Sequence, residues 1–133
     1  MSGETDLSIL LKTMKPELNE GIYSFYTVES LAGLRIPLED ILMFFQEKES
    51  ITLIVSQQNA VKYQLSQENL FSWITLSVHS SLSAVGLTAA FSGALAKVNI
   101  SCNVVSGYYH DHIFVGYEDT DCAMQELRKF MIQ

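Results

Sequence analysis

Histidines and a carboxylate lie close together in the last quarter of the chain, where they could bind a metal or move a proton. His110, Asp111 and His112 are consecutive residues, and imidazole and carboxylate groups are both zinc ligands and acid–base groups. On an extended strand, His110 and His112 would share one face. A closed zinc site needs further ligands, and only His79, Asp111 itself or a distant acid remain to complete it. We therefore favour a polar hairpin turn over a metal site, and we expect neither metal nor cofactor. An alternative that stays open is that one of these histidines reaches a ligand bound by a facing module.

A second polar group precedes a segment of helical spacing. His79, Ser80 and Ser81 end an apolar run, and Gly86 follows shortly after them. A helix N-terminus offers N–H groups and a partial positive charge, which together favour a carboxylate, and glycine allows close approach. Serines also cap helices routinely, so a purely structural role for this loop remains open.

The first half of the chain is predicted to contain three strands and two helices. Runs rich in branched and aromatic residues predict strands over residues 7–12, 21–28 and 51–55. Apolar residues at helical spacing predict a helix over residues 37–47, and residues 57–63 fit a short helix or turn.

The second half repeats this alternation more clearly. It predicts a strand, a helix, two hairpin-connected strands and a last helix, at residues 71–78, 83–98, 101–106, 113–117 and from 119 onward. Asn99 is a candidate left-handed cap, after which Ile100 would fold back onto the helix. In the last helix, the residues expected to face the core are Cys122, Leu127, Phe130 and Met131.

This order predicts an α+β fold, a ferredoxin-like βαββαβ arrangement that lacks its fourth strand. Because an unpaired sheet edge promotes aggregation, we expect residues 7–12 to supply that strand. The two halves are therefore expected to be interlocked, with antiparallel sheets.

Composition excludes several classes of function. The 133 residues carry a formal net charge of −7, which opposes binding to nucleic acid or anionic lipid. An acidic, polar start does not resemble a signal peptide, and serines interrupt the uncharged stretch at residues 69–96. We expect a cytoplasmic protein whose Cys102 and Cys122 are reduced, small hydrophobic residues.

Two segments of the second half resemble the ACT domain family. Residues 79–87 and 95–104 match its loop with a glycine, its helix and its second strand. Residues 100–105 and 107–115 are similar to a subfamily of small bacterial stand-alone proteins with tandem ACT-like modules, as is the opening at residues 11–18. The resemblance implies an N-terminal ACT-like module over residues 1–66 and a C-terminal ACT domain over residues 67–133.

In the ACT family, the resemblance implies, small ligands and usually amino acids bind where the first strand meets the first helix, between two modules. Carried over by position, the candidate ligand-binding residues are His79, Ser80, Ser81, Leu82, Val85, Gly86, Leu87 and Asn103, with His110 and His112 as further candidates. Many ACT domains have an acidic residue where this chain has His79, which leaves the binding of an amino group open.

The function we expect is therefore a non-enzymatic regulatory or sensor module that binds a small molecule, of which an amino acid is the expected class, and that forms a homodimer. A small metal- or histidine-dependent enzyme centred on His79, His110 and His112 is the alternative from the enzyme class. A structural interaction module without a ligand is the third possibility.

Overall fold

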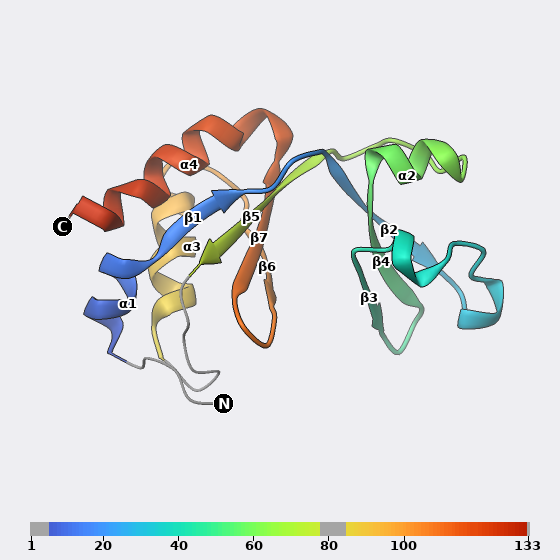
Figure 1. Cartoon of the computed structure of the whole chain (residues 1–133), viewed down its shortest axis with the longest axis horizontal. Helices are drawn as coiled ribbons and strands as arrows, with labels where there is room; N and C mark the ends of the chain where they lie inside the picture. The colour runs from blue at the N-terminus through green and yellow to red at the C-terminus, as the bar shows by residue number, and fades with distance from the viewer. Residues whose placement is uncertain (1–5, 78–84, 133) are drawn as a thin grey trace. The chain divides into compact units, whose positions relative to one another are not determined.

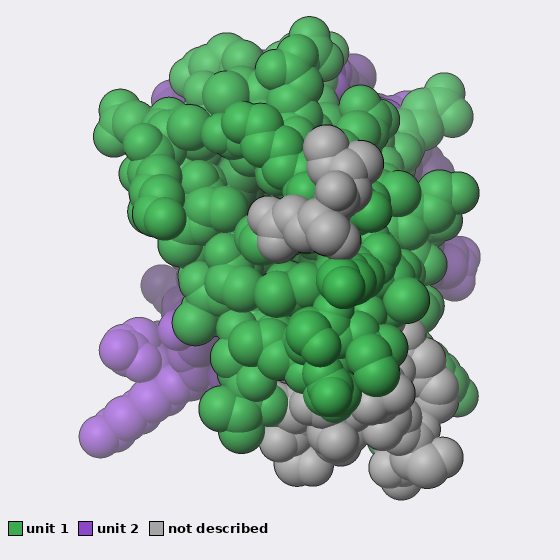
Figure 2. Space-filling model, turned by 90° about the vertical axis from the view of Figure 1, so that its left-hand side faces the viewer, with its two compact units in different colours: residues 1–20, 72–133 green, residues 21–71 purple. Residues whose placement is uncertain are grey.

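The computed structural model describes residues 6–77 and 85–132, and the chain divides into two compact units. Unit 1 comprises Met1–Glu20 together with Ser72–Gln133, and unit 2 comprises Gly21–Phe71. Figure 2 distinguishes them by colour. The N-terminal segment thus belongs with the second half of the chain, and the two modules are interlocked as predicted.

In the described residues, unit 1 contains three α-helices and two short 3-10 helices packed against a sheet (Figure 1). Its elements are α1 (Leu7–Thr13), β1 (Lys15–Leu18), β5 (Phe71–Ser77), α3 (Leu87–Lys97), β6 (Asn103–Ser106), β7 (Asp111–Gly116), the 3-10 turn η3 (Tyr117–Asp119), α4 (Thr120–Arg128) and the 3-10 helix η4 (Lys129–Ile132). The first residue of β5 belongs to unit 2 and the rest to unit 1. Within unit 1 the hydrogen-bonded strand order is β1-β5-β7-β6.

The fourth strand of unit 1 comes from the N-terminal segment, but from a different part of it than predicted. Residues 7–12 form helix α1, not a strand, because the Asp6 side chain accepts hydrogen bonds from the backbone N–H groups of Ser8 and Ile9 and caps it. The strand is β1, which pairs antiparallel with β5. Figure 1 shows β1 beside β5. The predicted donation of a strand is therefore confirmed, whereas the predicted residues are wrong.

Helices pack against the apolar face of this sheet. Alternate residues of β5 and β7 point into one core, which also holds residues of α1, α3 and α4. The fully or nearly buried members are Leu10, Met14, Ile74, Leu76, Leu87, Phe91, Leu95, Ile100, Ile113, Val115, Ala123, Met124 and Leu127.

Within α4, Leu127 is buried as predicted, and Phe130 in η4 packs against the same core. Cys122 and Met131 are exposed, so their predicted core positions are wrong.

Helix α3 ends as its sequence predicts. Asn99 has a φ of 63°, and its N–H donates to the carbonyl of Ala96. The N–H of Ile100 donates to the carbonyl of Leu95 at 3.0 Å, and the Ile100 side chain is buried. These bonds form a Schellman motif, which turns the chain back toward the sheet.

Unit 2 is built on a three-stranded antiparallel sheet in the order β3-β4-β2. Its elements are β2 (Tyr23–Val28), the 3-10 turns η1 (Leu31–Gly33) and η2 (Leu38–Asp40), β3 (Met43–Gln46), β4 (Ile51–Ser56) and α2 (Gln57–Lys62). The start of β5 adds to this sheet through the pair Tyr23 and Phe71. A small core lies on one face, formed by Ile51, Leu53 and Val55 with Tyr26 and Val28 packed against it.

The helix predicted over residues 37–47 is wrong. Only the single turn η2 forms there, and β3 pairs with β4 in register from Met43 with Ile54 to Gln46 with Ile51. A helix and a strand would each bring apolar residues of this segment into contact with the sheet. The strand forms because it also gains backbone hydrogen bonds to β4. The strands predicted at residues 21–28 and 51–55 are confirmed with slightly different ends, and of the short helix or turn predicted at residues 57–63 the helix forms, as α2.

Candidate functional site

Helix α3 begins at Leu87, directly after a glycine in the left-handed region. Gly86 occupies the N-cap position with a φ of 96°, a backbone conformation that side-chain-bearing residues adopt at a cost. The helix thus begins four residues later than the predicted position, Ser83, because Gly86 turns the chain immediately before it. Four predicted site residues, His79, Ser80, Ser81 and Leu82, lie outside the described residues.

The described residues around Gly86 differ in what they could offer a ligand. Val85 is 83% exposed, whereas the Leu87 side chain is buried in the core of unit 1. Leu87 can therefore contribute its backbone N–H but not its side chain. The first turn of a helix presents N–H groups without acceptors inside the helix, and its partial positive charge favours a carboxylate.

Helix α1 closes one side of this turn. A Cβ placed on Gly86 would lie 3.0 Å from Cδ2 of Leu7. Figure 1 shows α1 near the start of α3. Gly86 therefore allows both the left-handed turn and the close approach of α1.

Asn103 does not lie at this end of the sheet. It begins β6, pairs with Phe114 and donates from Nδ2 to the Phe114 carbonyl at 3.1 Å. Phe114 in turn stacks on Trp73, near the start of β5, with ring centroids 6.4 Å apart. Gly86 follows the other end of β5, so Asn103 and Gly86 lie at opposite ends of the sheet of unit 1.

His112 is the centre of a side-chain network that the sequence analysis did not predict. Its Nδ1 lies 3.0 Å from Nε1 of Trp73 and 3.0 Å from the Thr75 hydroxyl. Because an indole N–H can only donate, Nδ1 is the acceptor and the proton lies on Nε2. The Thr75 hydroxyl accepts from Nδ2 of Asn19 at 2.9 Å, which leaves its own proton for Nδ1.

This network connects three strands of unit 1. Asn19 directly follows β1, Trp73 and Thr75 lie on β5, and His112 lies on β7. The one available signal in the sequence was Trp73, an apolar residue on the polar side of an alternating strand. In the structure that position is explained by its N–H, which donates to His112.

The environment of His112 favours the neutral ring. Burial lowers the pKa of His112, the neighbouring His110 lowers it further, and Asp111 partly opposes this. A second proton on Nδ1 would also face the Trp73 N–H, which can only donate a hydrogen bond. His112 is therefore held as a neutral hydrogen-bond acceptor.

The connection between β6 and β7 is the polar hairpin that the sequence predicted. The Gly107 N–H donates to the His110 carbonyl at 2.9 Å, and the Ser106 hydroxyl donates to the Asp111 carboxylate at 2.8 Å. Among residues 6–77 and 85–132, no three histidine, cysteine or acidic side chains are grouped so that they could hold a metal ion. His110 and His112 thus belong to a hairpin and a sheet network in the part of the chain that the structure describes.

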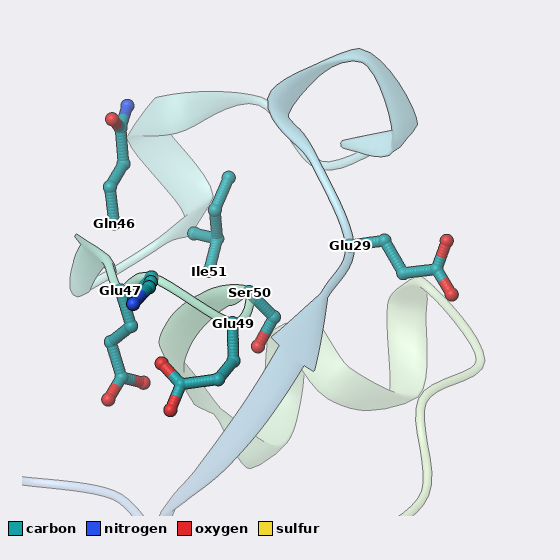
Figure 3. Close-up of a pocket in the computed structure, with 7 residues that line it drawn as sticks. Glu29, Gln46, Glu47, Glu49, Ser50 and Ile51 are labelled. Carbon is teal, nitrogen blue, oxygen red and sulfur yellow. The ribbon is translucent and has the colours of Figure 1, made fainter.

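An acidic hollow of about 270 Å³ lies in unit 2, at the turn between β3 and β4. It is lined by Glu29, Gln46, Glu47, Lys48, Glu49, Ser50 and Ile51. Figure 3 shows the carboxylates of Glu47 and Glu49 on one side and that of Glu29 pointing away from them. Glu47 also accepts a hydrogen bond from the Thr52 hydroxyl. These carboxylates do not converge on one point, so the hollow is not a cation site.

The order of strands and helices in the two units defines a class of fold, namely tandem ferredoxin-like modules. An ACT domain model matches residues 2–72, and a second ACT domain model matches residues 71–129. The chain belongs to the ACT domain family and contains two ACT domains in tandem. No helix in the described ranges is long and apolar enough to cross a membrane.

Solved structures support this assignment. A Vibrio cholerae protein of unknown function, described as a possible transport protein, is 46% identical, with 94% of this chain and 95% of that chain covered and a TM-score of 0.81. An Agrobacterium tumefaciens protein is 14% identical, covering 89% of both chains with a TM-score of 0.67. The ligand-free regulatory subunit of aspartate kinase from Thermus thermophilus is 11% identical, covering 90% of this chain and 97% of its own, with a TM-score of 0.62. The last two show a shared fold alone. No curated protein matches the chain.

Proposed function

We propose that this protein is a non-catalytic sensor that binds an amino acid or a similar small carboxylate at the start of α3. The observation that carries the proposal is the left-handed Gly86 at the N-cap of α3 in an ACT domain. That turn presents helix N–H groups beside an exposed Val85, and it favours a negatively charged group. The aspartate kinase regulatory subunit from Thermus thermophilus has the same fold, which agrees with a regulatory role.

The proposed site keeps the residues expected from the sequence. His79 would supply an imidazole, Ser80 and Ser81 would supply hydroxyl groups, and Leu82 would supply apolar contact. Val85, Gly86 and the Leu87 N–H would form the turn. Asn103, at the opposite end of the sheet, would take part only from a second copy of the chain. His110 and His112 would act through the hairpin at the same end of the sheet as the loop.

We further propose that the protein is bacterial and cytoplasmic and that it forms a homodimer. Along the sequence, we place the boundary between its two ACT domains between residues 66 and 67. β3 and β6 end the strand orders of units 2 and 1, so each leaves one edge for a partner strand. Residues Phe44 and Phe45 of β3 are exposed, and no charged residue lies within that strand.

A thermal-shift screen against the twenty amino acids tests the proposal. At a ligand concentration 100 times its dissociation constant, binding adds about 2.7 kcal/mol to the free energy of unfolding. We expect at least one amino acid to raise the melting temperature of the unmodified chain by several degrees. A flat response at millimolar concentration of every amino acid would favour a structural interaction module instead.

A matched pair of variants locates the site. Val85→Glu places a negative charge beside the start of α3 and should abolish the shift by repelling the ligand carboxylate. Val61→Glu makes the same charge change at a residue of α2 that is 57% exposed, and it should leave the shift intact. Equal shifts in both variants would place the ligand elsewhere. Gly86 itself is unsuitable for this test, because the turn and Leu7 both oppose a side chain there.

A further inference from the structure

The two ACT units differ in the segment that connects their first two strands. In unit 1 the connection from β5 to β6 contains α3, an 11-residue helix whose apolar side chains cover the sheet. In unit 2 the connection from β2 to β3 contains only η1 and η2, each of three residues. One face of the unit 2 sheet therefore lacks the helix that covers the corresponding face of unit 1.

A cavity of about 570 Å³ lies on that face. It is lined by Phe25, Tyr26, Thr27, Val28, Ile36, Thr52, Leu53 and Leu65. Leu53 of β4 belongs to the buried core of unit 2, and Tyr26 and Val28 of β2 pack against that core. Ile36 comes from the segment between β2 and β3, and Leu65 comes from the segment between α2 and β5. Volumes between about 300 and 1,000 Å³ are typical of pockets for small organic molecules.

The two residues from the connecting segments are fixed by their backbones. Ile36 precedes Pro37, which restricts it to extended conformations, and its side chain is 8% exposed. Leu65 follows Gln64, which has a φ of 60°, and the Leu65 N–H donates to the Ala60 carbonyl at 2.8 Å. This closes α2 with a Schellman motif and turns Leu65 back. The cavity is therefore formed before any ligand arrives.

The side-chain hydroxyls of the lining already have partners within unit 2. The Thr27 hydroxyl lies 2.6 Å from that of Ser50, and the Thr52 hydroxyl donates to Glu47. The Tyr26 hydroxyl donates to the Ser66 carbonyl. None of the eight lining residues carries a charge. What the cavity offers a ligand is apolar contact, and a charged ligand would lose its hydration there without a compensating partner.

We propose that this cavity binds a small, uncharged, apolar organic molecule. The proposal goes beyond the amino-acid site in unit 1, because it concerns another unit and the opposite ligand chemistry. The fixed positions of Ile36 and Leu65 favour a small molecule over a partner helix, which needs an open face along its whole length.

Titration of the full chain with N-phenyl-1-naphthylamine, a neutral fluorescent probe, tests the proposal. We expect saturable binding of one probe per chain. The probe is excited at a wavelength that tryptophan does not absorb, so the tryptophan variants can be compared directly. Leu65→Trp fills the cavity and should weaken probe binding about tenfold or more. Val61→Trp adds the same ring at an exposed position of α2 outside the lining and should leave the affinity unchanged. Equal affinities in the two variants, or binding that never saturates, would overturn the proposal.

Two further measurements cover the remaining outcomes. If Leu65→Trp does not fold, as judged by circular dichroism, methyl NMR of the unmodified chain replaces it. Probe-induced shifts confined to Val28, Ile36, Leu53 and Leu65 support the proposal, and shifts that instead fall on Leu10 and Leu95 of unit 1 contradict it. Light scattering decides whether a second copy occupies the cavity: a dimer that Leu65→Trp dissociates would overturn the small-molecule assignment.

Discussion

Two glycines of the α3 region differ in what they contribute to stability. Gly86 has a φ of 96°, and a Cβ there would lie 3.0 Å from Leu7. Gly93 lies inside α3, and beyond its chain neighbours and the local helix backbone a Cβ there would meet no atom within 4 Å. We expect Gly86→Ala to lower the free energy of unfolding by about 1–3 kcal/mol. Gly93→Ala should raise it by about 0.5–1 kcal/mol, because alanine loses less backbone entropy in a helix.

Urea unfolding of the two variants measures this difference directly. The two substitutions add the same methyl group a few residues apart, so each serves as the control for the other. A Gly86→Ala variant as stable as the unmodified chain would contradict the assignment of the left-handed turn.

His112 predicts a pH dependence of stability. Burial lowers its pKa in the folded chain below the unfolded value, so the unfolded chain binds more protons at mildly acid pH. The stabilisation is fully present above the unfolded pKa of about 6.5 and is lost as the pH falls through the folded pKa. Stability should therefore decrease on acidification below about pH 6.5.

Unfolding midpoints measured between neutral and mildly acid pH test this dependence. His112→Asn keeps an acceptor near Trp73 but does not titrate, and it should flatten the profile. His110→Asn should keep most of the slope, since burial is the larger cause of the shift. Identical profiles for His112→Asn and the unmodified chain would show that another group titrates.

The network around His112 also marks the limit of prediction from sequence at this scale. Asn19 and Thr75 are 56 residues apart, and their hydrogen bond exists only because β1 pairs with β5. The left-handed Asn99 was predictable because its cap depends on neighbouring residues alone. Site residues assembled from distant strands had no such local signal.

At the scale of elements, the same distinction separates correct from incorrect predictions. β5, α3, β6, β7 and α4 follow their sequence periodicity and were predicted. The α1 segment is a short apolar run whose periodicity fits helix or strand, and the deciding signal, the Asp6 cap, was missed. The β3 segment has helical spacing, but pairing with β4 overrides it.

β1 and the helix before it complete the sheet and the core of unit 1. β1 supplies the strand beside β5, and the segment before it contributes Leu10 of α1 and Met14, which follows α1, to the core with no exposed surface. We expect a chain that begins at residue 21 to lose the folded unit 1, because its core and one sheet edge would be open.

A rearranged chain provides the positive control for that truncation. α1 packs against η4, so residues 72–132 followed by a short flexible linker and residues 6–20 should restore the unit in a single domain. Dispersed amide NMR signals from this permuted domain, and collapsed signals from residues 72–132 alone, are the expected results. A folded 72–132 fragment would show that β1 is dispensable.

At the scale of the whole molecule, we expect a dimer of twice the chain mass of 14.9 kDa. β3 is an edge strand without charged residues, and Phe45 on it is 63% exposed. Such an edge pairs readily with another strand unless a charge protects it. Phe45→Lys should therefore give the monomer mass in light scattering.

The control for this variant is Leu38→Lys. Leu38 is 61% exposed but lies on η2, outside any strand, so the added charge should leave the dimer intact. A dimer that persists in Phe45→Lys would place the interface at another surface. A monomer mass for the unmodified chain would contradict the proposed dimer.

The insertion of unit 2 into unit 1 has a mechanical consequence. Both ends of the chain belong to unit 1, and β1 and β5 clamp together the two segments that lead into and out of unit 2. A pulling force applied to the two termini is therefore borne by this clamp and does not reach residues 21–71 while the clamp holds. In an optical-tweezers experiment unit 2 should never extend first: every trace should begin with rupture of unit 1, whatever the relative stabilities of the two units in solution.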